Sequence, residues 1–203
     1  MRPPRYPNVH LFLDICQGLG LALAAGIRPF FPALVAGLLA MADWGIDFEG
    51  TRYVFLESPV WLGAVAVLMI LTFVLRRTTQ GPTDAAIGGM GIGLGALLFA
   101  GTLADHNHDS LGWAILGLLG GAAVAVLGQL AYRDLVARTS QRLDEQARNA
   151  LPLWFDAIAG ALAALSIALP PVSIIAIVFV IWLLLGGRRR AEGKYAGLRS
   201  LSK

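Results

Sequence analysis

Long apolar stretches, separated by short polar or charged segments, run through almost the whole chain. Several windows of about 18 residues or more carry no charge, and that length of helix crosses roughly 30 Å of hydrocarbon. The clearest windows are 58–75, 85–104, 111–132 and 169–187. Their apolar residues are continuous rather than alternating, which favours membrane helices over membrane strands. The pattern predicts an all-α, polytopic membrane bundle of about six transmembrane helices in a single domain, residues 1–203.

The first apolar run extends from about Leu11 to Ala42, which is too long for one upright helix. It is interrupted between Gly26 and Pro32, where two prolines remove backbone donors and clash with the preceding turn. We expect a first helix, an irregular joint and a second short helix to about Met41. Either the joint lies at membrane depth, or it ends a crossing that a re-entrant segment follows.

The remaining apolar windows predict five further helices, and two polar segments accompany them. Residues 133–149 are interpreted as a solvated cytoplasmic linker helix, with Asp134 and Arg138 at a favourable i,i+4 spacing. Residues 188–203 form a basic cytoplasmic tail.

Arginines mark the N-terminus, the segments after the second and fourth predicted crossings, and the C-terminus. Loops on the other side are acidic or neutral. The positive-inside rule then places both termini in the cytoplasm, and six crossings satisfy that arrangement. The first, broken element is accordingly counted as one net crossing.

A short signature recurs about every 70 residues: Asp14 with Gly18, Asp84 with Gly88, and Asp156 with Gly160. The repeat units would cover about 8–77, 78–140 and 150–190, each with two crossings. Since every unit starts inside, they suggest three parallel helical hairpins. The alternative is a duplication without symmetric packing, because the signature is short.

Composition supports the membrane class. Of the 203 residues, 57% are hydrophobic and only 14% are charged, with a mean hydropathy of +0.68. A soluble domain of this length rarely has so few charges. The net charge of +3 does not indicate nucleic-acid binding, because the basic residues lie at helix ends.

Four charged residues within or beside apolar sequence are candidates for function. Asp14, Asp84 and Asp156 would either complement helix dipoles in a first turn or form a carboxylate ring around a cytoplasmic vestibule. Arg28 lies between Gly26 and Pro29, in the middle of the longest apolar run. Broken helices expose backbone groups that transporters use for ligands. We therefore expect a substrate-binding site there. Otherwise Arg28 snorkels to the interface or pairs with an aspartate to hold the joint.

Pairs of small residues at i,i+4 spacing predict close helix packing and a homo-oligomer. They are Gly18/Ala22, Gly89/Gly93, Gly91/Gly95, Gly117/Gly121 and Ala157/Ala161. No metal site is expected, since His106 and His108, the nearest candidates, supply few ligands. No cofactor motif or catalytic constellation stands out, so an enzyme is not predicted.

The stretch from Gly18 through Ala25 to Leu34, together with residues 149–152 and the hairpin at Asp156, resembles a family of uncharacterised bacterial integral-membrane proteins, the domain of unknown function DUF4126. Members usually carry an acidic, proline-containing stretch after the second helix, where this chain reads Phe73-Val74-Leu75-Arg76-Arg77. The resemblance implies the bacterial inner membrane and supplies no reaction or ligand.

The sequence thus predicts a transporter or channel for a small solute or ion, in contact with membrane lipids. Two alternatives stay open: a scaffold that assembles partners through its glycine faces, and a protein that binds lipid headgroups at Arg28. A polar path that reaches Arg28 would favour transport, and a closed core would favour the scaffold.

Overall fold

The computed structural model describes residues 7–75, 82–104, 111–140 and 143–199, and every regular element in them is a helix. The elements are α1 (Pro7–Ile27), α2 (Phe30–Met41), the 3-10 helix η1 (Val54–Glu57), α3 (Pro59–Leu75), α4 (Pro82–Ala104), α5 (Leu111–Thr139), α6 (Glu145–Ala168) and α7 (Val172–Arg199). The all-α helical bundle is therefore confirmed. Three segments are long and apolar enough to cross a membrane, namely Ala85–Ala104, Leu111–Thr139 and Glu145–Ala168.

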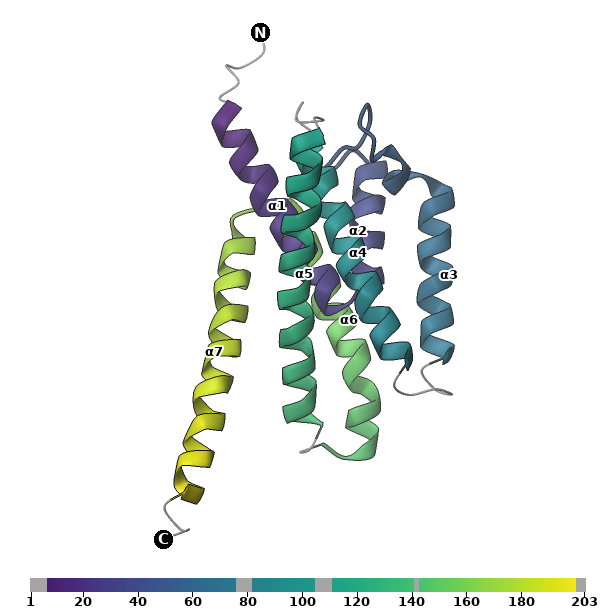
Figure 1. Cartoon of the computed structure of the whole chain (residues 1–203). Coiled ribbons are helices and arrows are strands. Elements are labelled where there is room, and N and C mark those ends of the chain that lie inside the picture. Colours follow the sequence, from purple (N-terminus) through teal and green to yellow (C-terminus); the bar gives the residue numbers. More distant parts are fainter. Residues whose placement is uncertain (1–6, 76–81, 105–110, 141–142, 200–203) are drawn as a thin grey trace.

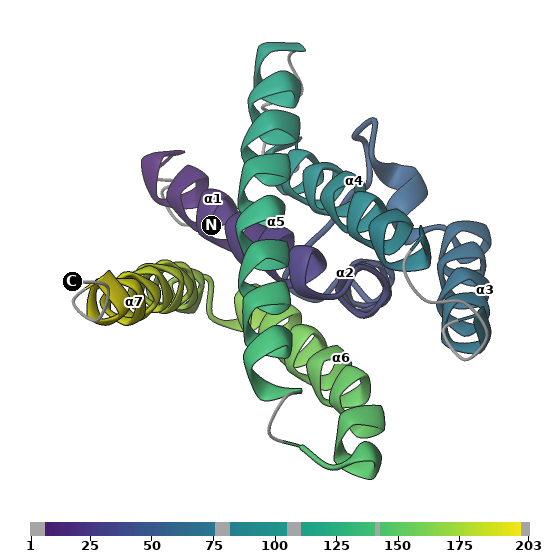
Figure 2. The ribbon, with the colours of Figure 1, turned by 60° about the horizontal axis from the view of Figure 1, so that its bottom comes forward.

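Helix α1 is the centre of the bundle. It packs against α2, α4, α5, α6 and α7, which surround it in Figure 2. Every residue from Leu21 to Gly26 is buried. The outer surface, in contrast, carries large apolar side chains, among them Val60, Val67, Leu119, Trp154, Ile175 and Trp182. Such a continuous apolar exterior suits lipid rather than water.

Small residues let the backbones of α1, α4 and α5 touch. A Cβ at Gly91 would lie 2.7 Å from the carbonyl oxygen of Ala25, and one at Gly121 would lie 2.6 Å from that of Gly95. Both distances are shorter than any ordinary carbon–oxygen contact. The predicted role of these glycines in close packing is confirmed.

The outward small-residue pairs differ from the buried ones. Gly89 and Gly93 have nothing within 4 Å of an added Cβ. Ala157 and Ala161 are likewise exposed. These two faces are not used for packing within the described part of the chain.

The break in the first apolar run is confirmed, and its geometry is that of a helical hairpin. Helix α1 ends at Ile27 because Pro29 disfavours helical geometry at Arg28, and α2 begins at Phe30. Helix α2 then runs back toward the end of the bundle where α1 started (Figure 1). The loop after α2 returns to α1 there, since Gln17 donates from Nε2 to the carbonyl oxygen of Gly45 at 2.8 Å.

The first apolar element thus starts and finishes at the same end of the bundle, which differs from the one net crossing expected from the sequence. The N-terminal end of α1 and the C-terminal end of α7 lie at opposite ends of the bundle (Figure 1). This arrangement differs from the expected one, in which both termini lie on the same side. Local proline rules located the break, but the return of α2 depends on contacts with distant helices.

Helix α1 also runs antiparallel to α4. Gly18 faces Phe99 and Thr102 near the end of α4, whereas Ala25 faces Gly91, more than a turn nearer its start. Helix α6 opposes α1 in the same way, because Gly20 faces Ser166 while Arg28 pairs with Asp156. Three parallel hairpins would require α1, α4 and α6 to share one direction. The parallel repeat is therefore contradicted for its first unit.

Residues 133–149 do not form a separate linker helix. Residues 133–139 continue α5, and α6 begins at Glu145, with the side chain of Asp144 as its N-cap. The Asp144 Oδ1 accepts from the backbone N–H of Ala147 at 2.8 Å. Beyond residue 187, α7 continues as helix to Arg199, where the sequence had indicated a tail.

Candidate functional site

The joint between α1 and α2 places a charged side chain inside the bundle. The backbone N–H of Arg28 still donates to Ala24 at 2.9 Å, so the helix is complete up to this residue. Pro29 follows with φ −68° and ψ −43°, and no side chain caps α2. Arg28 is only 4% exposed. Arg28 was singled out from the sequence as a charge in the middle of an apolar run, and the structure buries this charge at the joint.

Asp156 of α6 is the ion-pair partner of Arg28. Its Oδ1 lies 2.9 Å from Arg28 Nε, and its Oδ2 accepts from Nη2 at 3.4 Å. The 2.9 Å contact is an ion pair whose alignment falls short of a hydrogen bond. Asp156 is 28% exposed, far more than Arg28. One of the two structural interpretations of Arg28, a pairing with an aspartate that holds the joint, is thus present.

An aromatic pair completes the surroundings of the guanidinium. The Cζ of Arg28 lies 5.3 Å from the centre of the Tyr132 ring, which is within the range of a cation–π contact. Tyr132 in turn meets Phe155 edge to face, with ring centres 4.9 Å apart. The joint, α5 and α6 therefore meet at Arg28.

A cavity of about 370 Å³ opens beside this joint, between α4 and α5. Its lining consists of Gly26, Ile27, Arg28, Pro29, Ala85, Ile87, Gly88, Gln129, Tyr132, Arg133, Val136 and Ala137. Among the described lining residues, two are arginines and none is an aspartate or glutamate. Ala85 to Gly88 belong to the apolar span of α4, so the cavity reaches into membrane-spanning sequence. Guanidinium groups, an amide and a tyrosine in an otherwise apolar wall favour an anionic ligand.

Gln129 and Arg133 are both held against Gly88. A Cβ at Gly88 would collide with the Gln129 amide and lie 3.3 Å from Arg133 Nη2. Only a glycine at position 88 leaves room for the side chains of Gln129 and Arg133 to pass across α4. Arg133 is exposed, whereas Arg28 is buried, and both line the cavity.

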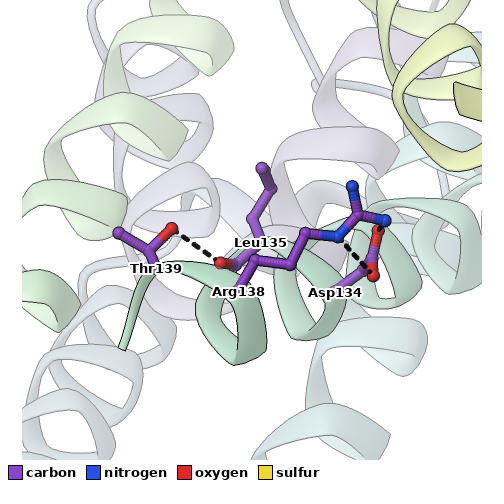
Figure 3. A network of polar contacts seen from close by, with 4 residues as sticks. All are labelled: Asp134, Leu135, Arg138 and Thr139. Carbon is purple, nitrogen blue, oxygen red and sulfur yellow. Dashed lines mark hydrogen bonds and ion pairs between the residues drawn. The ribbon is translucent and has the colours of Figure 1, made fainter. Parts of the chain in front are cut away.

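One turn further along α5, Arg138 belongs to a different environment. It pairs with Asp134 through both Nε and Nη2 on the exposed face of the helix, and Thr139 donates to the carbonyl oxygen of Leu135 (Figure 3). The predicted i,i+4 pair is confirmed. Arg138 does not line the cavity, and it therefore provides a matched control for Arg133.

The three signature aspartates do not form a ring. Asp14 is buried in α1, about 20 Å along the helix from Arg28 at 1.5 Å per residue. Asp156 pairs with Arg28, in the middle of α6. Asp84 lies in the first turn of α4, and its side chain is outside the described residues. Of the two aspartates whose side chains are described, Asp14 and Asp156, Asp156 belongs to the site.

The lining residues that α5 supplies were not singled out as a site from the sequence: Gln129, Tyr132, Arg133, Val136 and Ala137. They lie at i, i+3, i+4, i+7 and i+8, which is one face of a helix, and this spacing could have identified them. Arg133 had instead been interpreted as one of the arginines that follow the fourth predicted crossing. His106 and His108 lie outside the described residues, and the described ones contain no cluster of three or more metal-ligating side chains.

Comparison with protein families matches residues 15–190 to a family described as a domain of unknown function (DUF4126). Neither the curated proteins nor the solved structures contain a match to this chain.

Proposed function

Since the chain belongs to the DUF4126 family, whose function is unknown, we propose from the geometry of the joint that it is a membrane protein that binds and transports a small anion. The observation that carries this proposal is the cavity of about 370 Å³, whose lining includes the buried Arg28 and the exposed Arg133. A cation inside membrane-spanning sequence is costly, and such residues commonly mark ion or substrate paths.

A broken helix at a binding site is a recurrent device of transporters. It brings unpaired backbone groups and a fixed charge to one point within the membrane. Gly26, Arg28 and Pro29, the residues of the break, all line the cavity. The described lining offers no nucleophile beside a general base, so we propose binding and transport rather than catalysis.

We propose that the cavity opens to the cytoplasm of a bacterial inner membrane. The ends of α3, α5 and α7 that share its side are followed or formed by arginines, at 76–77, 133 and 138, and 188–190. The opposite side carries Asp43, Asp47, Glu49 and Glu57. The positive-inside rule places the arginine side in the cytoplasm. With a re-entrant first hairpin, α3 to α7 make five crossings, and the N-terminus lies outside.

The test is binding of inorganic phosphate, acetate and chloride to the purified protein, read as thermal stabilisation in detergent. Arg133→Gln should weaken binding about 10- to 100-fold, because a hydrogen bond to a charged group contributes roughly 1.5–3 kcal/mol. Arg138→Gln should leave it unchanged. Saturation by phosphatidylglycerol micelles, without any response to the free anions, would instead identify a lipid headgroup as the ligand. Equal binding by all variants would refute the site.

A second candidate function is a scaffold that assembles copies of the chain. It is favoured by Gly89 and Gly93, which lie on the outer face of α4 with no neighbour within 4 Å of an added Cβ. Such a face allows close approach of another helix. Replacement of both glycines by leucine should convert an oligomer to a monomer in detergent, as measured by light scattering. An unchanged mass would remove this candidate.

A further inference from the structure

Arg28 lies between the cavity and Asp156, and a ligand in the cavity would compete with Asp156 for its positive charge. Arg28 is one of the residues that line the cavity, and its guanidinium also pairs with Asp156, which is not among the described lining residues. Tyr132 belongs to both surroundings, since its ring lies beside the guanidinium and it contributes to the cavity wall. An anion that enters the cavity therefore meets a cation already neutralised by the protein.

We propose that Asp156 is an internal competitor, and that a bound anion takes over Arg28 while Asp156 is released. This inference rests on the proposed function. A buried cation requires a counter-charge, and an entering anion would supply it as Asp156 leaves. Ligand binding and the freedom of α6 at the joint are thereby coupled, and the coupling is reciprocal.

Three features of the pair make Asp156 the member that leaves. It is 28% exposed against 4% for Arg28, so its carboxylate is already in partial contact with the outside. Its contacts with Arg28 are uneven, at 2.9 Å and 3.4 Å, unlike a symmetric two-bond pair. Arg28 itself is fixed by the joint backbone, with Pro29 on one side and the last turn of α1 on the other.

The exchange has a mechanical consequence for α6. Toward its C-terminal end, α6 stays packed on α1, where Ser166 of α6 and Ser173 of α7 fill the space beside Gly20. At Gly160, one turn from Asp156, the nearest contact is the side chain of Phe31 in α2, at 3.2 Å from an added Cβ. Release of Asp156 therefore removes the ion pair between α6 and the joint, while the contacts of Phe155 with Tyr132 and of Gly160 with Phe31 remain.

The experiment compares affinities for inorganic phosphate in wild-type protein, Asp156→Asn and Arg133→Gln. Asparagine keeps the shape of aspartate and removes the competing charge, so D156N should bind phosphate at least 10-fold more tightly than wild type. If Asp156 only stabilises the fold, D156N should bind phosphate with unchanged or lower affinity than wild type. That result, together with weaker phosphate binding by R133Q, would overturn the exchange between Asp156 and the anion but would leave the proposed binding site intact. If wild type and D156N both fail to bind phosphate, acetate and chloride, the site and the exchange are both wrong.

A measurement on the wild-type protein guards against misfolding of the variant. Infrared difference spectra with and without phosphate, on protein carrying ¹³C-carboxyl aspartate, should show a carboxylate stretching band that shifts when an aspartate loses its guanidinium partner. Arg138→Gln supplies the reference spectrum for the surface pair with Asp134. The absence of any phosphate-dependent aspartate band in a protein that binds phosphate would overturn the proposal.

Discussion

The side-chain amide of Gln129 lies in the space that a Cβ at Gly88 would fill. Helix α4 therefore accommodates a polar side chain of α5 at a point where only a glycine leaves room. Because Gln129 and Gly88 both line the cavity, the size of residue 88 controls where the Gln129 amide lies.

Gly88→Ala should push Gln129 into the cavity and weaken phosphate binding by about 10-fold or more. The cost in stability should stay at about 1–3 kcal/mol, since a flexible side chain can move aside. Isothermal titration and thermal unfolding measure the two effects. Gly89→Ala, at an open position one residue further, should change neither. Equal effects of both substitutions would contradict the assigned contact.

Gly26→Ala should destabilise the protein more severely than Gly88→Ala. An added Cβ at Gly26 meets the backbone of Ala125 rather than a side chain, so α1 and α5 must separate. We expect a loss of about 3 kcal/mol or more, measured by denaturation in detergent. Gly93→Ala, which meets no atom within 4 Å, is the control and should lie within about 0.5 kcal/mol of wild type.

Asp156→Ala should destabilise the fold by roughly 3–5 kcal/mol, because it leaves Arg28 buried without its counter-charge. The double change Arg28→Met with Asp156→Leu should recover most of that loss. The exposed pair of Arg138 and Asp134 supplies the comparison, where Asp134→Ala should cost at most about 1 kcal/mol (Figure 3). A double variant no more stable than D156A would show that the pair is not responsible.

Stability should depend on Glu57 in mildly acidic solution. Burial raises the pKa of Glu57 above its ordinary value of 4.5, and the nearby charges of Asp47, Glu49 and Asp43 raise this pKa further. The hydrogen bond from the backbone N–H of Phe48 lowers the pKa in part. The folded state then binds the proton more tightly than the unfolded state, so stability falls as pH rises from about 4.5 through the raised pKa. Glu57→Gln should flatten this fall in thermal unfolding curves. A curve that rises across the window would reverse the assigned sign.

Fusions of a periplasm-active reporter should place the two termini on opposite sides. The re-entrant hairpin returns α2 to the side of the N-terminus, so fusions before Pro7 and within 105–110 should report one side and a fusion at Lys203 the other. The fusion within 105–110 tests only whether α4 crosses the membrane. Both termini on one side would restore the six-crossing topology.

The sequence predicted those features that local chemistry determines. Pro29 and Pro32 located the break within two residues, and the uncharged windows located the helices. Arg28 was identified because a charge in an apolar run is rare. The return of α2 was not predictable, since it depends on Gln17 meeting Gly45 across the loop.

The three-fold repeat failed for a related reason. A signature of one aspartate and one glycine carries no information about direction, and the opposed packing of α1 on α4 arises from the contact of Gly18 with Phe99. Asp156 was a candidate for the site, although as a member of a ring rather than as the partner of Arg28. The part of α5 after Tyr132 supplies Arg133, Val136 and Ala137 to the cavity wall. This polar segment had been assigned from the sequence to a separate linker helix, so its place beside the cavity was not predicted.

The central position of α1 has a consequence for how the protein is made. This helix leaves the ribosome before α4, α5, α6 and α7, although these four helices are what shields it from lipid. Asp14, Gln17 and Arg28, all buried in the finished bundle, therefore enter the bilayer without their later neighbours. The ion pair at the joint can form only after α6, the sixth α-helix along the chain, has been made.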